Sequence, residues 1–151
     1  MASFIFDSAK GRWVEKFLLP IGGDNIVVVL LKSAGLQADA TLNNYATLAT
    51  LLAGGSAEAT FTNYARKVLS ASDLSVSVNT GTGVTTVDAT DQVWNAAGGA
   101  SNDVLGAILF CYRPTSGSLD SAILPLTKHD YSTTTTGGNL TAQVPSVGTV
   151  T

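Results

Sequence analysis

The chain has 151 residues, about the length of one domain, and only 13% of them are charged, against roughly 25% in ordinary soluble domains. Its net charge of −3 excludes the broad basic face that nucleic-acid binding requires. Ser, Thr, Asn and Gly replace the missing charges, a composition suited to β-rich surfaces and to surfaces buried in assemblies. We therefore expect one domain over residues 1–151 and no nucleic acid among its partners.

Nothing in the sequence predicts a membrane segment or a disulfide. The longest apolar run, residues 26–31, is far too short to cross a bilayer. The stretch "MASFIFDSAKGRW" places acidic and basic residues where a signal peptide would be apolar, so we expect synthesis in the cytoplasm. Cys111 is the only cysteine and lies in the apolar run "LGAILFCY", which indicates a small buried side chain.

The first third of the chain predicts helices around one buried strand. Residues 7–19 place Ala9, Trp13 and Phe17 on one helical face, with Pro20 beyond the end. Residues 24–33, "DNIVVVLLKS", are β-branched and continuously apolar, which indicates a strand covered on both faces, the preceding helix forming one cover. Residues 39–55 return to helical spacing and stop at Gly54–Gly55.

From residue 60 onward the apolar period changes to two, which predicts strands. These cover residues 60–69, a hairpin over 73–89 with its turn at "NTGTG", residues 105–114, and residues 121–131. Pro125 restricts the last of these to a sheet edge or a bulge. Residues 132–151, rich in Thr and Gly, suit either a final strand or an extended arm that reaches a neighbour. The fold class is therefore α+β, mainly an antiparallel sheet or sandwich with one or two short helices in the N-terminal third.

The stretch "DATDQVWNAAGG", residues 88–99, surrounds Trp94 with polar and acidic side chains. Val87 and Trp94 cannot share one face of a regular strand, because their spacing is odd. We expect a turn or bulge near Thr90–Asp91, with Asp88 and Asp91 in solvent or capping amides and Trp94 packed against the next strand. The sequence leaves open whether Trp94 packs inward or faces a partner.

No residue set predicts catalysis, a cofactor or a metal. His129 is the only histidine, and it has no zinc-ligand partners at a suitable spacing. Two carboxylates of the glycosidase kind are the remaining option, but no pattern brings any two of the candidates together across a cleft. Those candidates are Glu58, Asp88, Asp91 and Asp120. We expect that the protein is not an enzyme.

Several blocks, taken in order, carry a resemblance. They are "DNIVVVLLKS", "FTNYARKVL", "TTVDATDQVWNAAGG", "LGAILFCYRP" and "SLDSAILPL", followed by the Thr/Gly-rich end. The series resembles small structural proteins of tailed-bacteriophage virions, of the head decoration or cement type, and it covers residues 12–145. The resemblance implies a capsid-stabilising protein on the outer surface of the head. Its expected partners are the major capsid protein and further copies of itself, as a dimer or trimer.

The basic residues form two groups that we expect to be solvated, Lys10, Arg12 and Lys16, then Arg66 and Lys67. For the capsid role we nominate six contact residues: Arg12 and Lys16 of the first helix, and Thr133, Thr134, Thr135 and Thr136 of the tail.

Two alternatives stay open. One is a tail, neck or fibre-base component of the same virion. The other is a carbohydrate-binding module with exposed Tyr45, Trp94 or Tyr112 as stacking platforms.

Overall fold

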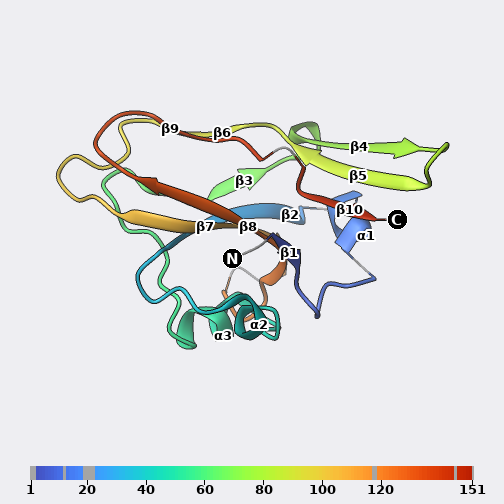
Figure 1. Cartoon of the computed structure of the whole chain (residues 1–151), viewed down its shortest axis with the longest axis horizontal. Helices are drawn as coiled ribbons and strands as arrows, with labels where there is room; N and C mark the ends of the chain where they lie inside the picture. Colours follow the sequence, from blue (N-terminus) through green and yellow to red (C-terminus); the bar gives the residue numbers. More distant parts are fainter. Residues whose placement is uncertain (1–2, 12, 19–22, 117–118, 145, 151) are drawn as a thin grey trace.

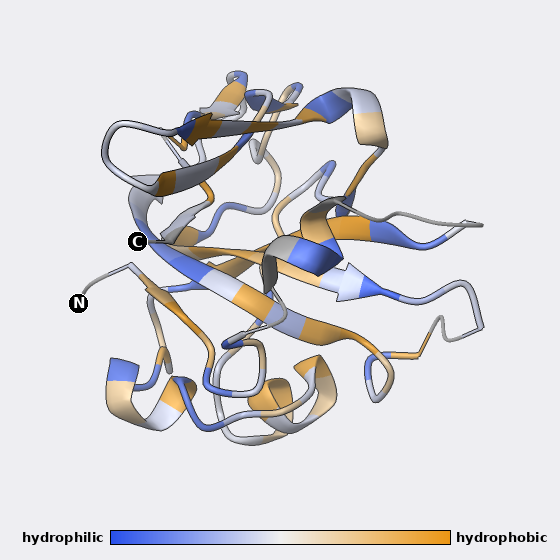
Figure 2. Ribbon diagram, turned by 90° about the vertical axis from the view of Figure 1, so that its right-hand side faces the viewer, coloured by the Kyte–Doolittle hydropathy of each residue, from blue (hydrophilic) through white to orange (hydrophobic). Residues whose placement is uncertain are grey.

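The computed structural model describes residues 3–11, 13–18, 23–116, 119–144 and 146–150. A five-stranded antiparallel sheet in the order β1-β8-β7-β2-β3 forms the middle layer. Helices α2 and α3 lie on one side of it and two small sheets on the other (Figure 1), an arrangement that Figure 2 shows from a perpendicular direction. The described part of the chain is thus an antiparallel β-structure with three short α-helices, and its core lies on both faces of the middle sheet.

The bounds of these elements are as follows. The middle sheet consists of β1 (Phe4–Ile5), β8 (Leu124–Thr134), β7 (Val104–Arg113), β2 (Asn25–Lys32) and β3 (Lys67–Leu69). The small sheets are β10 (Gly148–Val150), β5 (Val84–Ala89) and β4 (Leu74–Asn79), and the pair β6 (Gln92–Trp94) and β9 (Leu140–Ala142). The helices are α1 (Trp13–Leu18), α2 (Asp39–Leu42), α3 (Leu48–Ala53) and the 3-10 turn η1 (Ala71–Asp73).

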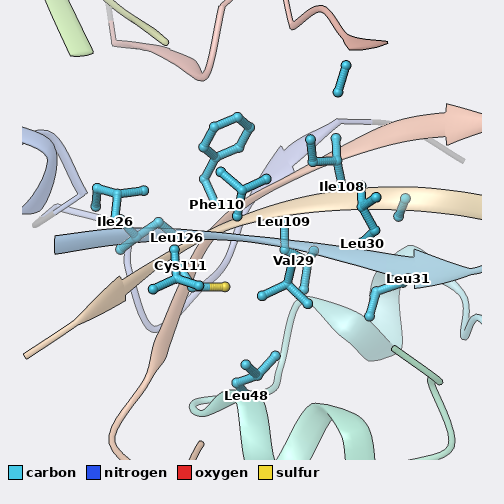
Figure 3. Packing of buried hydrophobic residues seen from close by; sticks show 14 of the residues in the cluster. Ile26, Val29, Leu30, Leu31, Leu48, Ile108, Leu109, Phe110, Cys111 and Leu126 are labelled. Carbon is cyan, nitrogen blue, oxygen red and sulfur yellow. The ribbon is translucent and has the colours of Figure 1, made fainter. Parts of the chain in front are cut away.

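Strands β2 and β7 form the centre of the core. All six residues of the run "IVVVLL" in β2 are at most 1% exposed, which confirms the prediction of a strand covered on both faces. Pairing places Val28 beside Phe110 on one face and Val29 beside Leu109 on the other. Figure 3 shows Phe110 and Val29 pointing to opposite sides of the two strands. Phe17 of α1 packs against Phe110, with ring centroids 6.5 Å apart, so the first helix contributes to one cover as expected.

Strand β8 lies inside the middle sheet, between β1 and β7. The ladder between β7 and β8 shifts register between Phe110 and Cys111, where Cys111 pairs with Pro125 and Phe110 pairs with Thr127. Proline has no N–H for a ladder bond, and the bulge removes the need for one. Of the two options for Pro125, the structure has the bulge.

Two helical predictions need correction. Residues 7–11 form turns, and α1 begins only at Trp13, because Gly11 adopts a left-handed φ of 84° that no α-helix contains. The helix expected over residues 39–55 is two helices, α2 and α3. The chain leaves the helix after Leu42, and Thr47 starts the second one by accepting a hydrogen bond from Thr50 N–H at 3.2 Å.

The strand expected over residues 60–69 is also shorter, since only Lys67–Leu69 form β3. Asn63 has a left-handed φ of 69°, which interrupts the alternation. The preceding backbone bonds to a remote loop instead of a ladder: Thr62 N–H donates to Ser101 O, and Gly98 N–H donates to Thr62 O. The hairpin prediction is confirmed, with β4 and β5 paired in register from Leu74–Ala89 to Asn79–Val84.

The C-terminal segment, residues 132–151, follows the strand alternative. Its described residues complete β8, pair as β9 with β6, and pair as β10 with β5. The strands of this segment that the structure describes pair within the chain. In the described residues no helix is long and apolar enough to cross a membrane.

Candidate functional site

The basic contact residues expected in the first helix are only partly placed. Arg12 lies outside the described residues. The ammonium group of Lys16 lies 4.4 Å from the centroid of the Tyr112 ring. Tyr112 in turn donates a hydrogen bond to Asp24, which also accepts from Thr115 N–H at 2.7 Å. The Asp24 bond raises the pKa of Tyr112 to about 12, and the bonds from Tyr112 and Thr115 lower the pKa of Asp24.

The four threonines expected in a contact tail differ in exposure. Thr133 and Thr134 are the end of β8, paired with Leu105 and Val104 of β7. Thr135 is 2% exposed; it donates its N–H to Asp103 O at 3.0 Å and accepts from Asp103 N–H at 2.8 Å through its hydroxyl. The side chain of Thr135 therefore holds the end of β8 against Asp103 and is buried within the chain. Thr134 and Thr136 are exposed.

The aromatic platforms of the carbohydrate alternative are occupied within the chain. Trp94 is 1% exposed, and its indole N–H donates to Ala65 O at 2.7 Å. Tyr45 is half-buried and donates to Gln37 at 2.8 Å. The ring of Tyr112 lies under Lys16. The largest of the three platforms is therefore in the core, which decides a question that the sequence left open.

The two acids near Trp94 have structural contacts. The extended segment is interrupted at Thr90–Asp91, between β5 and β6, where a turn or bulge was predicted. The carboxylate of Asp88 accepts a hydrogen bond from Ala89 N–H at 2.9 Å. Asp91 accepts from Gln143 Nε2 at 2.9 Å. Both acids therefore hold local backbone or side-chain geometry, as the prediction for this stretch stated.

The strongest ionic cluster centres on Arg66, which was expected to be solvated. Its guanidinium contacts Glu58 at 2.6 and 2.8 Å and Asp120 at 2.6 and 3.0 Å. The side chain is 27% exposed. Tyr64 joins the cluster by donating to Glu58 at 2.8 Å and accepting from Leu30 N–H at 3.2 Å. The cluster ties the loop before β3 to the loop before β8 and to the central strand β2.

The electrostatics of this cluster favour a structural role. Hydrogen bonds that Arg66 donates to Glu58 and then to Asp120 raise the pKa of Arg66, and the bond from Arg66 lowers the pKa of Asp120. A general acid needs a carboxyl group whose pKa is raised, and the pKa of Asp120 is lowered instead. Arg66 thus brings together Glu58 and Asp120, two of the four candidate carboxylates, through two ion pairs. Arg66 and Asp120 are 54 positions apart, so no pattern of residue spacing predicts their contact. Tyr64, two positions before Arg66, was a weak local sign of the cluster.

A second cluster surrounds Lys128 of β8, which is 0% exposed. Its ammonium group contacts Asp39 at 3.1 Å and Asp130. A buried ammonium group is tolerated only with such partners, and the pair attaches α2 to the middle sheet. In the described ranges no group of three or more His, Cys, Asp or Glu side chains lies in an arrangement that could hold a metal ion.

His129 and Cys111 are both packed within the chain. The ring of His129 stands edge-on to Phe110, and its Nε2–H donates to Val147 O at 3.1 Å. Burial lowers the pKa of His129. It borders a hollow of about 560 Å³ between β1 and the end of the chain, which Lys10 and Asn43 also line. Cys111 is buried as predicted, and burial raises its pKa.

The outer edge of β4 has the character of an assembly surface. Within the described ranges the strands at sheet edges are two or three residues long, except β4, which has six. No charged residue lies between Asp73 and Asp88. The hairpin extends to one end of the molecule (Figure 1), and Val78 near its tip is 62% exposed. A long edge without charge or proline is open to another strand.

A search against protein-family models finds no match, and searches of the curated proteins and of the solved structures find none either.

Proposed function

We propose that this chain is a structural protein of a tailed-bacteriophage virion that binds the outer capsid surface and stabilises the head, as a decoration or cement protein. The order of the sequence blocks supports the family. The observation that carries the assembly role is the six-residue, uncharged edge of β4 at one end of the molecule. In this proposal the small sheets and the middle sheet are the two layers of a sandwich, and the helices cover its far side.

The internal contacts suit a protein that must resist deformation. Arg66 joins two loops and the central sheet, and Lys128 joins α2 to the same sheet. The charged groups of these clusters are satisfied inside the chain, which leaves much of the outer surface to hydroxyl and amide side chains. Such a surface forms many modest contacts with low desolvation cost, since few charges have to leave water.

The mechanism is clamping of neighbouring capsomers. One subunit or oligomer spans adjacent capsomers, so that expansion of the shell by packaged DNA must break its contacts. Each contact is modest, and repetition over the lattice supplies the overall strength through effective concentration. The major capsid protein and further copies of this chain are the partners in this scheme.

The test is the copy number of the protein in purified particles. A decoration protein is present in hundreds of copies and remains with tailless heads, as measured by gel densitometry against the major capsid band. Heads that lack it should release their DNA at lower temperature. A handful of copies per particle, or loss together with the tails, would refute the decoration role and favour the tail, neck or fibre-base alternative.

A further inference from the structure

We infer that β4 pairs in antiparallel fashion with β4 of a second copy, which joins two three-stranded sheets into one of six strands. The inference rests on the assembly role proposed above and names its surface and its partner.

The first reason is that β4 lacks the protections that edge strands normally carry. Proteins guard their edges with short strands, lysines, prolines or bulges, because the free N–H and C=O groups of an edge accept another strand. β3 carries Lys67 at the edge of the middle sheet and has three residues. β4 has six residues, "LSVSVN", and an uninterrupted register with β5.

The second reason is that the strand is complementary to itself. Leu74, Val76 and Val78 share one face, and Ser75 and Ser77 share the other. Residues directly opposite in an antiparallel pair lie on the same face. When a two-fold axis passes through Val76, every apolar residue therefore opposes an apolar residue, and the two serines oppose each other. When the axis passes through Ser77, Val76 opposes Val78 and Ser77 opposes itself, while Ser75 opposes Asn79 and Leu74 opposes Thr80.

The third reason is the exposure of Val78. Val76 pairs with the buried Val87 on β5 and packs on the core, whereas Val78 pairs with Thr85 and is 62% exposed. With the axis at Val76, Val78 would lie opposite Leu74 of the second copy. With the axis at Ser77, it would lie opposite Val76 of that copy. Both registers cover an apolar side chain that the single chain leaves in water.

Charge does not oppose this pairing. Asp73 is the nearest acid before the strand. It would lie opposite Asn79 of the second copy in one register and opposite Gly81 in the other, so no two like charges meet. A shift of one residue would place valines opposite serines and is excluded by the same alternation.

Six residues a side bury less than the area of a stable, permanent interface, so the isolated dimer should be weak. We expect a dissociation constant of roughly 10 µM to 1 mM. On a particle the same contact would be strengthened by neighbouring attachments, which suits a subunit that assembles only on its lattice.

The experiment is sedimentation equilibrium of the full chain over concentrations from about 10 µM to about 1 mM, the range in which weak interfaces dissociate. The mass should rise from 15.5 kDa toward twice that value. Ser77→Lys changes an exposed side chain and brings two ammonium groups close to the axis, so dimerisation should weaken at least about tenfold. Val68→Lys is the matched control, because Val68 is 51% exposed on the β3 edge. This variant should dimerise as the wild type does.

Circular dichroism of both variants establishes that each is folded. A monomer at every concentration overturns the inference, and so does equal behaviour of the two lysine variants. A second arm uses Ser77→Cys, which forms a disulfide-linked dimer under mild oxidation if the axis passes through Ser77, while the native Cys111 stays buried. If particles hold hundreds of copies of a chain that stays monomeric in solution, the pairing fails and the decoration role stands. If the chain dimerises in solution but is absent from particles, the pairing stands and the decoration role fails.

Discussion

Replacing Arg66 with alanine should destabilise the fold more than replacing an exposed charged residue does. The guanidinium joins Glu58 and Asp120, and the three side chains are 27%, 20% and 32% exposed. Without it, two carboxylates remain close together at a half-buried position, and Glu58 keeps only its bond from Tyr64. The loops before β3 and β8 would then lose the link between them.

The magnitude lies between two limits. Removing one partner of a fully buried pair costs about 3–5 kcal/mol, whereas exposed pairs contribute about 0–1 kcal/mol. Because all three side chains are less than one third exposed, we expect Arg66→Ala to lower the free energy of unfolding by about 2–3 kcal/mol. For a chain of this size that corresponds to a fall in Tm of about 4–12 °C.

The assay is urea unfolding, followed by circular dichroism, of the wild type, Arg66→Ala, Asp120→Asn and the double variant. The cycle should show coupling, because the second change costs less once Arg66 is gone. Lys10→Ala is the control, since its pair with Asp7 is 60% and 47% exposed and should leave the midpoint unchanged. A loss below about 0.5 kcal/mol for Arg66→Ala, or strict additivity with Asp120→Asn, would refute the argument.

Three further predictions concern single contacts. Tyr64→Phe leaves Leu30 N–H without its acceptor and should cost about 1–3 kcal/mol in urea unfolding; an unchanged midpoint would show that the amide finds another acceptor. The pKa of His129 is lower in the folded chain, so the unfolded state binds the proton first. Stability should be fully present above pH about 6.5 and fall below it, by at most about 1.4 kcal/mol per pH unit, and His129→Gln should flatten this difference between pH 5 and 8. In Gly106→Ala the new Cβ would lie 2.9 Å from Ser33 Cα, so Tm should drop; an unchanged Tm would mean that β7 shifts freely there.

The fold was predicted best where the signal lies within one stretch of chain. The continuous apolar run of β2 required cover on both faces, and "NTGTG" between alternating residues required a hairpin; both are present. The predicted helix and strand boundaries were wrong where single residues adopt a left-handed backbone conformation. Gly11 and Asn63 do so, and the apolar spacing on either side of them carries no sign of the interruption.

The candidate site was predicted less well, because its contacts join distant parts of the chain. Thr135 was assigned to a contact surface from composition, but pairing of β7 with β8 carries it to the backbone of the buried Asp103. Arg66 was expected in solvent because it forms a short basic group with Lys67, and such groups are usually solvated. Asp120 reaches it only through the return of the chain toward β8, and no local pattern encodes that return.

The sequence by itself determined the period of the hairpin strands, the position of the hairpin turn and the irregularity at Thr90–Asp91, but left open whether Trp94 packs inward. These depend on side-chain spacing and on turn chemistry, which act over a few residues. Only the tertiary structure decided which edges remain free, where the C-terminal strands go and which carboxylates meet Arg66. Those outcomes depend on closing loops across the whole chain, where the choice among partners is made by the packing of the complete core.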